Sequence, residues 1–271
     1  MSLVVTLICN PANPALDSTA VEAVRAILPS PSQADWLFDG VAADIAFASD
    51  ENQRTLQNKL RHALGDLPVD VVVQPKATRR KRLFLADMDS ERAMRVEIEF
   101  APALRERVAL LKGLPVSVVD EVIARHITLT PGGKALVATM RRHGAYTCLV
   151  SGGFTLFTSR IAAMIGFNEN RANELLIDGD KFSGQVAEPI LGREAKLDTL
   201  NDLKESFELD DIDTLVVGDG ANDLGMIEAA GLGVAYPAKP AVAAAAAARI
   251  DHGDLTALLY AQGFRRSEFV E

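Results

Sequence analysis

The stretch Lys81-Arg-Leu-Phe-Leu-Ala-Asp-Met-Asp-Ser90 decides how the rest of the chain is interpreted. Its apolar run predicts a buried strand, and two carboxylates, Asp87 and Asp89, follow one residue apart. Side chains two positions apart on a strand point the same way, so both carboxylates converge at the strand's carboxyl end, where open α/β sheets bind ligands. A cation would relieve the repulsion between them, and Mg²⁺ prefers carboxylates, phosphate oxygens and water.

A second predicted strand ends in Ser151-Gly152-Gly153, just before a predicted helix. Backbone N–H groups at such a turn and helix start would face an anion, and the Ser151 hydroxyl would add a further donor. An ordinary turn with a serine cap explains the same residues equally well. The segment is therefore a phosphate-binding candidate only in combination with the acidic residues.

A third predicted strand ends in Gly218-Asp-Gly-Ala-Asn-Asp223. Asp219 would complete a magnesium site, and Asp223 would orient either Asp219 or a metal-bound water. Lys196 lies between these elements, at the start of a predicted helix, where it could neutralise both a phosphate and Asp87. Taken alone, a solvent-exposed lysine is the commoner case.

The region from Arg82 onward alternates strands with helices, which predicts an α/β fold with a parallel sheet. A charge-rich helical segment, residues 91–127, interrupts the alternation directly after the Asp pair, where a lid would be inserted. A hairpin over residues 174–186 forms a flap. The predicted strands are 83–86, 146–150, 214–217 and 233–236, and the helices include 133–142, 155–165 and 191–207.

Residues 1–78 have a different pattern and predict a separate small unit, followed by a core over residues 79–271. An apolar strand at 3–8, an amphipathic helix at 17–28, a strand pair around Asp39-Gly40, a helix at 52–64 and a last strand at 70–74 follow one another. The order βαββαβ is that of ferredoxin-like folds. Nothing in this unit has catalytic character.

Composition limits the classes of function. The chain of 271 residues is 48% hydrophobic and carries a net charge of −9, which argues against non-specific binding to nucleic acid or anionic membranes. Its two cysteines, Cys9 and Cys148, lie in apolar runs and fit a reducing cytoplasm. No apolar run reaches membrane-spanning length, and the N-terminus lacks the features of a signal peptide. We expect a cytoplasmic protein.

The ordered set D-x-D, Ser-Gly-Gly, Lys and G-D-G-x-N-D resembles the haloacid dehalogenase superfamily of phosphohydrolases, and within it the bacterial phosphoserine phosphatases. The resemblance covers residues 82–264, including the runs 104–115 and 127–133, and implies a Rossmann-like core with a small helical cap. The N-terminal unit resembles the ACT-like domain that precedes some of these enzymes. Such domains often sense amino acids and often pair, which implies an amino-acid effector and a homodimer.

The resemblance also implies a role for each site residue. Asp87 is the nucleophile, and Asp89 protonates the leaving serine and then activates water. Asp87, Asp219 and the Asp89 carbonyl hold Mg²⁺. The other residues would bind the substrate phosphoserine: Ser151, Gly152, Lys196 and Asn222 contact the phosphoryl group, Arg107 pairs with the serine carboxylate, and Met94 and Phe100 close the apolar side of the pocket.

One departure from the family pattern follows Ser90. The family continues D-x-D-S-T and then carries an acidic residue for the substrate's amino group, but here Glu91-Arg-Ala-Met94 comes at once. Val96 also replaces a usual glycine. Either the natural protein has a connector that this sequence omits, or the segment is deleted. The first interpretation leaves a phosphoserine phosphatase; the second leaves room for a phosphatase with another small substrate, or for an inactive amino-acid-sensing homologue.

Overall fold

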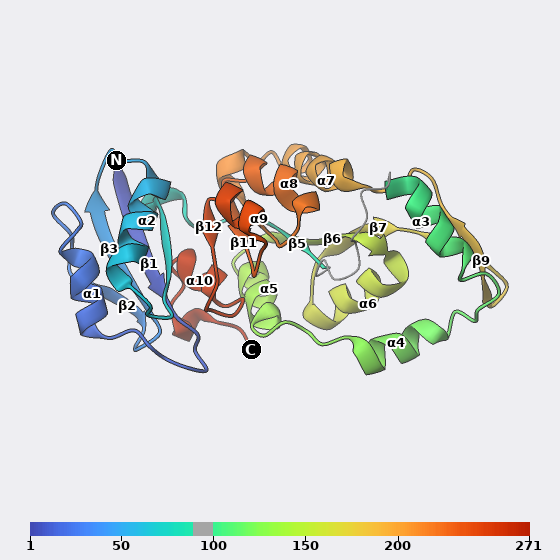
Figure 1. Ribbon diagram of the computed structural model, residues 1–271, viewed down its shortest axis with the longest axis horizontal. Coiled ribbons are helices and arrows are strands. Elements are labelled where there is room, and N and C mark those ends of the chain that lie inside the picture. Colours follow the sequence, from blue (N-terminus) through green and yellow to red (C-terminus); the bar gives the residue numbers. More distant parts are fainter. Residues whose placement is uncertain (89–99) are drawn as a thin grey trace.

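The computed structural model describes residues 1–88 and 100–271, and within these it contains two main sheets and a small hairpin (Figure 1). The N-terminal sheet has the antiparallel order β2-β3-β1-β4, with two helices. This confirms the predicted βαββαβ unit. Its elements are β1 (Ser2–Ile8), α1 (Ser18–Arg25), β2 (Asp35–Phe38), β3 (Ala42–Ala48), α2 (Gln53–Leu64) and β4 (Asp70–Pro75).

Local chemistry explains where these elements begin and turn. Asp17 is the N-cap of α1, and its side chain accepts the N–H of Ala20 at 2.8 Å. Gly40 has a φ of 70°, which suits the turn between β2 and β3 because glycine adopts this conformation without a steric penalty. The glycine turn agrees with the strand pair predicted around Asp39-Gly40, whereas α1 ends at Arg25, earlier than predicted.

The second sheet has the order β12-β11-β10-β5-β6-β7, and all its pairs are parallel. β5, which ends in Asp87, lies between β10 and β6. Its strands are β5 (Leu83–Asp87), β6 (Tyr146–Phe154), β7 (Glu169–Asn173), β10 (Thr214–Gly218), β11 (Leu232–Ala235) and β12 (Ala248–Arg249). Its helices are α5 (Gly133–Arg142), α6 (Thr155–Ile165), α7 (Arg193–Ser206), α8 (Leu224–Ala229), α9 (Pro240–Ala245) and α10 (Ala257–Ala261).

Both faces of β5 are buried, which is why its sequence is a continuous apolar run. Phe84 and Ala86 belong to the core shared with α5 and α6, whereas Leu83 and Leu85 belong to the core shared with α7. The alternation therefore fixes β5 at the centre of a three-layer α/β arrangement. Its carboxyl end emerges beside those of β6 and β10.

The cap consists of α3 (Phe100–Ala109), α4 (Val118–His126) and the hairpin β8 (Leu175–Asp178) and β9 (Lys181–Val186). These elements lie at the opposite end of the molecule from the N-terminal unit (Figure 1). The hairpin joins the segment between these helices through backbone hydrogen bonds from Gly113 to Phe182 and from Phe182 to Leu114, at 2.9 and 3.0 Å. The predicted flap is thus one body with the described part of the cap.

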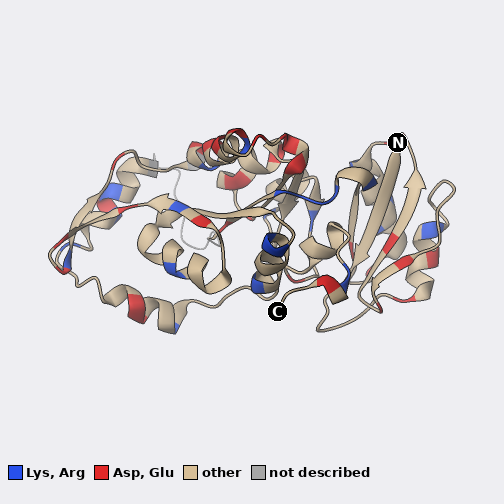
Figure 2. Cartoon of the chain, turned by 180° about the vertical axis from the view of Figure 1, so that it is seen from behind, with Lys and Arg blue, Asp and Glu red and all other residues tan. Residues whose placement is uncertain are grey.

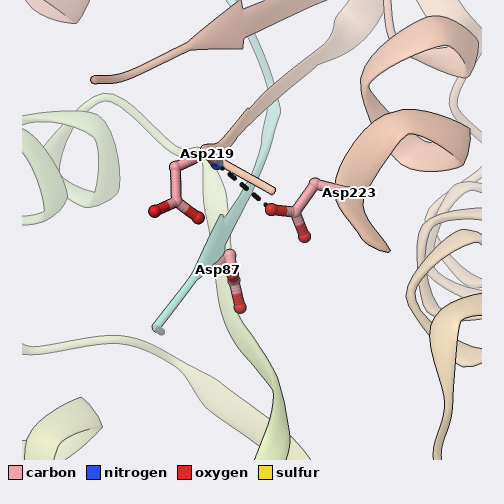
Figure 3. Close-up of side chains that lie close together, drawn as sticks. All are labelled: Asp87, Asp219 and Asp223. Carbon is pink, nitrogen blue, oxygen red and sulfur yellow. Dashed lines mark hydrogen bonds between the residues drawn. The ribbon is translucent and has the colours of Figure 1, made fainter. Parts of the chain in front are cut away.

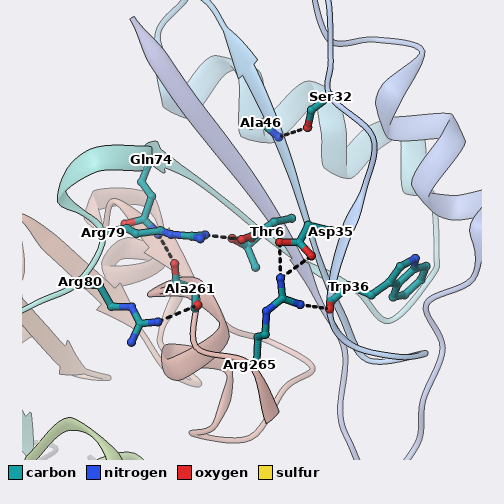
Figure 4. A network of polar contacts seen from close by, with 12 residues as sticks. Thr6, Ser32, Asp35, Trp36, Ala46, Gln74, Arg79, Arg80, Ala261 and Arg265 are labelled. Carbon is teal, nitrogen blue, oxygen red and sulfur yellow. Dashed lines mark hydrogen bonds and ion pairs between the residues drawn. The ribbon is translucent and has the colours of Figure 1, made fainter. Parts of the chain in front are cut away.

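The open face of the N-terminal sheet packs against the C-terminal segment (Figure 4). Gln74 of β4 donates to the carbonyl of Ala261 in α10 at 2.7 Å. Arg265 binds both carboxylate oxygens of Asp35 at 2.7 Å and the carbonyl of Trp36 at 2.8 Å. Residues from the two ends of the chain therefore form one interface.

The core differs from the prediction in two places. β6 continues to Phe154, so the Ser151-Gly152-Gly153 segment is strand and not the predicted turn. β7 was not predicted, because its sequence Glu-Asn-Arg-Ala-Asn has no apolar alternation. The division after residue 78 stays a prediction. Within the described residues, no helix combines the length and apolar character that a membrane crossing requires.

Candidate active site

The site forms where β5, β6 and β10 end, and its centre is an ion pair between Asp87 and Lys196. The Lys196 ammonium nitrogen lies 2.7 Å from Oδ1 of Asp87 and 2.6 Å from Oδ1 of Asp223. The side chains of Lys196 and Asp87 are each 3% exposed, and that of Asp223 is fully buried. The expectation that Lys196 by itself is a surface lysine is therefore wrong.

Lys196 stays protonated in this setting. Burial alone would lower its pKa, but the charges of Asp87 and Asp223 and their hydrogen bonds outweigh burial, so that the pKa of Lys196 is raised. Acidic residues otherwise dominate α7, as Figure 2 shows along this helix, and Glu194, Asp198, Asp202 and Glu205 all belong to it. Lys196 is thus a buried cation that α7 brings to the site.

Asp223 fixes the backbone at the tip of β10 (Figure 3). Its Oδ2 accepts the N–H of Asp219 at 3.1 Å and that of Gly220 at 3.0 Å. A Cβ on Gly218 would lie only 2.5 Å from Oδ2 of Asp223, so the glycine allows the carboxylate to pack against the strand end. Asp223 therefore ties the position of Asp219 to that of Lys196.

Asp87, Asp219 and Asp223 form an acidic cluster that could hold a metal ion. Each offers a carboxylate oxygen, and these oxygens lie within 4.8 Å of one another. Carboxylate oxygens are hard donors, and these are the ligands that Mg²⁺ favours. The donors present in the described residues therefore fit a hard divalent cation.

Ser151 and Gly152 lie on β6 next to Asp87, because Val150 pairs with Asp87 across the sheet. Ser151 is buried, and its hydroxyl accepts the N–H of Gly153 at 2.8 Å. The structure thus brings the predicted serine and glycine to the same edge as the acidic residues. Ser151 and Gly152 reach this edge as part of the carboxyl end of β6.

A pocket of about 580 Å³ opens beside the carboxylates. Asp87, Asp219 and Tyr236 line it, together with Met88 and the segment 126–130 that leads from α4 to α5. Pockets of this size accommodate small-molecule ligands. Asp87 and Asp219 therefore face a space that a small substrate could enter beside the segment 126–130.

Other predicted residues are placed less decisively. Arg107 is exposed on α3, and Asn222 is half-buried in a 3₁₀ turn, Ala221–Asp223, directly before α8. Phe100 begins α3. Asp89 and Met94 lie outside the described residues. The structure thus brings together Asp87, Ser151, Gly152, Lys196, Asp219 and Asp223.

Sequence reasoning missed Asn173, whose buried side chain joins two parts of the site. It donates to the carbonyl of Gly152 at 2.9 Å and accepts the N–H of Leu191 at 2.7 Å. Because β7 lacks an apolar pattern, nothing in the sequence marked this position. The burial of Lys196 did have a signal, since Leu200 and Leu203 follow it at helical spacing and are buried on the same helix face.

The model of the haloacid dehalogenase-like hydrolases matches residues 59–228, more than half of the chain. The phosphoserine phosphatase of Archaeoglobus fulgidus is 37% identical over 225 residues, which are 72% of this chain and 65% of that protein. The chain therefore spans slightly less than two thirds of that relative's length.

Two solved structures agree with this relationship. The unliganded probable phosphoserine phosphatase of Vibrio cholerae has a TM-score of 0.76 and 26% identity, with 98% of this chain and 88% of that chain covered. A phospho-aspartyl intermediate analogue of phosphoserine phosphatase has a TM-score of 0.60 and 32% identity, with 67% of this chain and 98% of that chain covered. The chain belongs to the haloacid dehalogenase-like hydrolases.

Proposed function

We propose that this protein is a phosphoserine phosphatase that hydrolyses O-phosphoserine to serine and phosphate, the last step of serine biosynthesis. The observation that carries the proposal is the buried contact of Asp87 with Lys196, held by Asp223 at the carboxyl edge of the sheet. The likeness to phosphoserine phosphatases supports the choice of substrate. A carboxylate paired with a fixed cation is suited to phosphoryl transfer, because attack brings phosphate charge next to the ammonium group.

Asp87 acts as the nucleophile in this proposal. Its carboxylate oxygen forms a bond to phosphorus while the bond between phosphorus and the seryl oxygen breaks, and that oxygen takes a proton from Asp89. Asp89 then takes a proton from water, which attacks the phosphorus of the aspartyl-phosphate. The bond to Asp87 breaks, and its carboxylate is restored. The role of Asp89 rests on the sequence, since this residue lies outside the described part of the chain.

We assign the metal site to Asp87, Asp219 and the backbone carbonyl of Asp89. Asp223 is occupied by Lys196 and two backbone N–H groups, so its part is to hold Asp219 in place. Bound Mg²⁺ would neutralise charge that develops on the phosphoryl oxygens. In this arrangement Lys196 supplies positive charge from the α7 side, and Ser151 and Gly152 supply donors from β6.

Recognition of the serine part rests on Arg107, Met94 and Phe100. Arg107 would bind the serine carboxylate with its guanidinium fork, Asn222 would contact the phosphate region, and Met94 and Phe100 would close the apolar side. The exposure of Arg107 on α3 leaves its guanidinium accessible to a substrate. An amino-acid effector at the N-terminal unit, a homodimer and a cytoplasmic location stay predictions.

The test compares two substrates and two matched arginines. Arg105 and Arg107 both lie on α3, and Arg105 forms an ion pair with Glu188. With Mg²⁺ present, Arg107→Ala should raise KM for phosphoserine at least about tenfold, because a charge-assisted pair contributes roughly 1.5–3 kcal/mol. The same substitution should leave hydrolysis of p-nitrophenyl phosphate unchanged. Arg105→Ala should alter neither the KM for phosphoserine nor the hydrolysis of p-nitrophenyl phosphate. Equal loss of both activities in Arg107→Ala would show that Arg107 does not recognise the carboxylate.

A wild-type protein that hydrolyses p-nitrophenyl phosphate but not phosphoserine would instead favour another small phosphomonoester. The sequence after Ser90 motivates this second candidate, because the threonine and the acidic residue that the family uses there are absent. A folded protein that hydrolyses neither compound yet binds serine in calorimetry would favour the sensing homologue.

A further inference from the structure

The side-chain amide of Asn173, the last residue of β7, uses all its hydrogen-bonding groups on the backbone of two other segments. It is 2% exposed. Nδ2 donates to the carbonyl of Gly152 at 2.9 Å and to that of Leu191 at 3.2 Å, while Oδ1 accepts the N–H of Leu191 at 2.7 Å. Because the Leu191 N–H can only donate, Oδ1 faces it, and one orientation of the amide satisfies the set.

The two segments that Asn173 joins carry the groups assigned to phosphate binding. Gly152 follows Ser151 on β6, where the strand register shifts between Val150 and Phe154. Leu191 lies two residues before α7, the helix that places Lys196 at 2.7 Å from Asp87. The amide therefore links the donors at the end of β6 with the start of the helix that holds the cation.

We propose that Asn173 is a positioning residue for phosphate binding. Its amide holds the Ser151–Gly152 backbone and the start of α7 at a fixed separation, so that Ser151, Gly152 and Lys196 surround one phosphoryl group. The inference rests on the proposed function for the identity of that phosphate site. A displacement of about 1 Å in such a site can cost about 10²-fold in rate, which gives the amide leverage although it does not touch the substrate.

A buried asparagine can also serve only to satisfy backbone groups. Asn168 provides a matched control for this alternative, because it lies at the other end of the same strand pair. Its Oδ1 accepts the backbone N–H of Thr147 at 3.0 Å and the Thr147 hydroxyl at 2.9 Å. Loss of the Asn168 amide removes hydrogen bonds between β6 and the start of β7, and loss of the Asn173 amide removes one at the end of β7. Of these two residues, only Asn173 borders the site.

The experiment measures the dissociation constant of inorganic phosphate by calorimetry with Mg²⁺ present, kcat and KM for phosphoserine, and Tm. Asn173→Ala should weaken phosphate binding and lower kcat at least about tenfold each, since the displaced donors no longer converge. Asn168→Ala should lower Tm while leaving phosphate binding and kcat within about twofold. Loss of phosphate binding in Asn173→Ala alone, beyond any shared fall in Tm, supports the positioning role.

Asn173→Asp decides the question if Asn173→Ala does not fold. The carboxylate keeps the shape and the acceptor for the Leu191 N–H but removes both donors, so it should weaken phosphate binding by a similar factor. A folded Asn173 variant that binds phosphate within about twofold of the wild-type protein overturns the proposal. A wild-type protein that binds phosphate but leaves phosphoserine intact overturns the proposed function only, because the phosphate comparison still tests Asn173.

Discussion

The ammonium nitrogen of Lys196 lies 2.7 Å from Oδ1 of Asp87, and each side chain is only 3% exposed. In a site so secluded from water the cation neutralises the carboxylate, and solvent screens their attraction little. The contact also depends on α7, so the chemistry at the tip of β5 is linked to the packing of a helix more than a hundred residues later in the chain.

We predict that Lys196→Met lowers kcat/KM for phosphoserine at least about 100-fold, because one preformed electrostatic contact to the transition state is lost. Unfolding free energy without Mg²⁺ should fall by about 3 kcal/mol, the lower end of the cost of breaking a buried ion pair. Lys204→Met is the control, since Lys204 lies on the same helix and pairs with the exposed Asp211 beyond its end. Denaturant titration and steady-state kinetics check both. Equal effects of the two substitutions would contradict the account.

Asp223→Asn should weaken activation by Mg²⁺ about 10- to 100-fold, because groups that orient metal ligands have effects of this size. The amide removes the charge that Lys196 contacts, and its NH₂ group must face a donor in either orientation, the Lys196 ammonium or the N–H groups of Asp219 and Gly220. The measurement is the Mg²⁺ concentration for half-maximal phosphate release. Asp213→Asn, at the other end of β10, should change it by less than about twofold, and an unchanged value in Asp223→Asn would refute the orienting role.

Asp70 joins the N-terminal unit to the core through three consecutive backbone N–H groups. Asp70 is 3% exposed, and its carboxylate accepts from Asp251 and Gly253 at 2.8 Å and from His252 at 3.2 Å. Asp70→Ala leaves these donors without their acceptor, and we predict a loss of about 3 kcal/mol in unfolding free energy.

The control for Asp70 is Asp66→Ala in the exposed loop before β4, which should change stability by less than about 0.5 kcal/mol. Urea unfolding followed by circular dichroism checks both variants. If Asp70→Ala is as stable as Asp66→Ala, the carboxylate does not hold the two units together.

Burial lowers the pKa of Lys81 to about 8, although the charge of Asp213 partly opposes the shift. The unfolded chain keeps the ordinary value of 10.5, so between these two values the unfolded state binds more protons and stability rises with pH. This stabilisation is lost as pH falls through the folded pKa.

We therefore expect the Tm of the wild-type protein to rise between pH 7.5 and 9.5 relative to that of Lys81→Met, in which this titration is absent. Lys59→Met, at an exposed pair with Glu51, should track the wild-type curve. Parallel Tm curves for wild type and Lys81→Met would show that Lys81 does not titrate in this range.

The sequence predicted the elements that periodicity governs and missed those that tertiary contacts govern. β5 and β10 are apolar throughout because both faces of each are covered, and this pattern is enough to place Asp87 and Asp219 at one sheet edge. The burial of Lys196 depends on how α7 packs on β5, so only its spacing from Leu200 and Leu203 hinted at it. Nothing in the sequence indicated Asn173, because its side chain binds the backbone of Gly152 and Leu191, which are 21 and 18 residues away.

The extension of β6 through Ser151 and Gly152 also escaped the sequence. Glycines before a helix usually indicate a turn, but pairing of Phe154 with Asn173 continues the strand past them. The functional prediction was unaffected, because the same residues reach the same edge of the sheet by either route.

The most direct test of the account is phosphate release from phosphoserine by the wild-type protein and by Asp87→Asn, with and without Mg²⁺. We predict release by the wild-type protein that requires Mg²⁺ and falls by at least about 10³-fold in Asp87→Asn, since an amide cannot act as the nucleophile. Circular dichroism verifies that both proteins are folded. A folded wild-type protein that releases no phosphate, or an Asp87→Asn variant that retains wild-type turnover, would contradict the central claim.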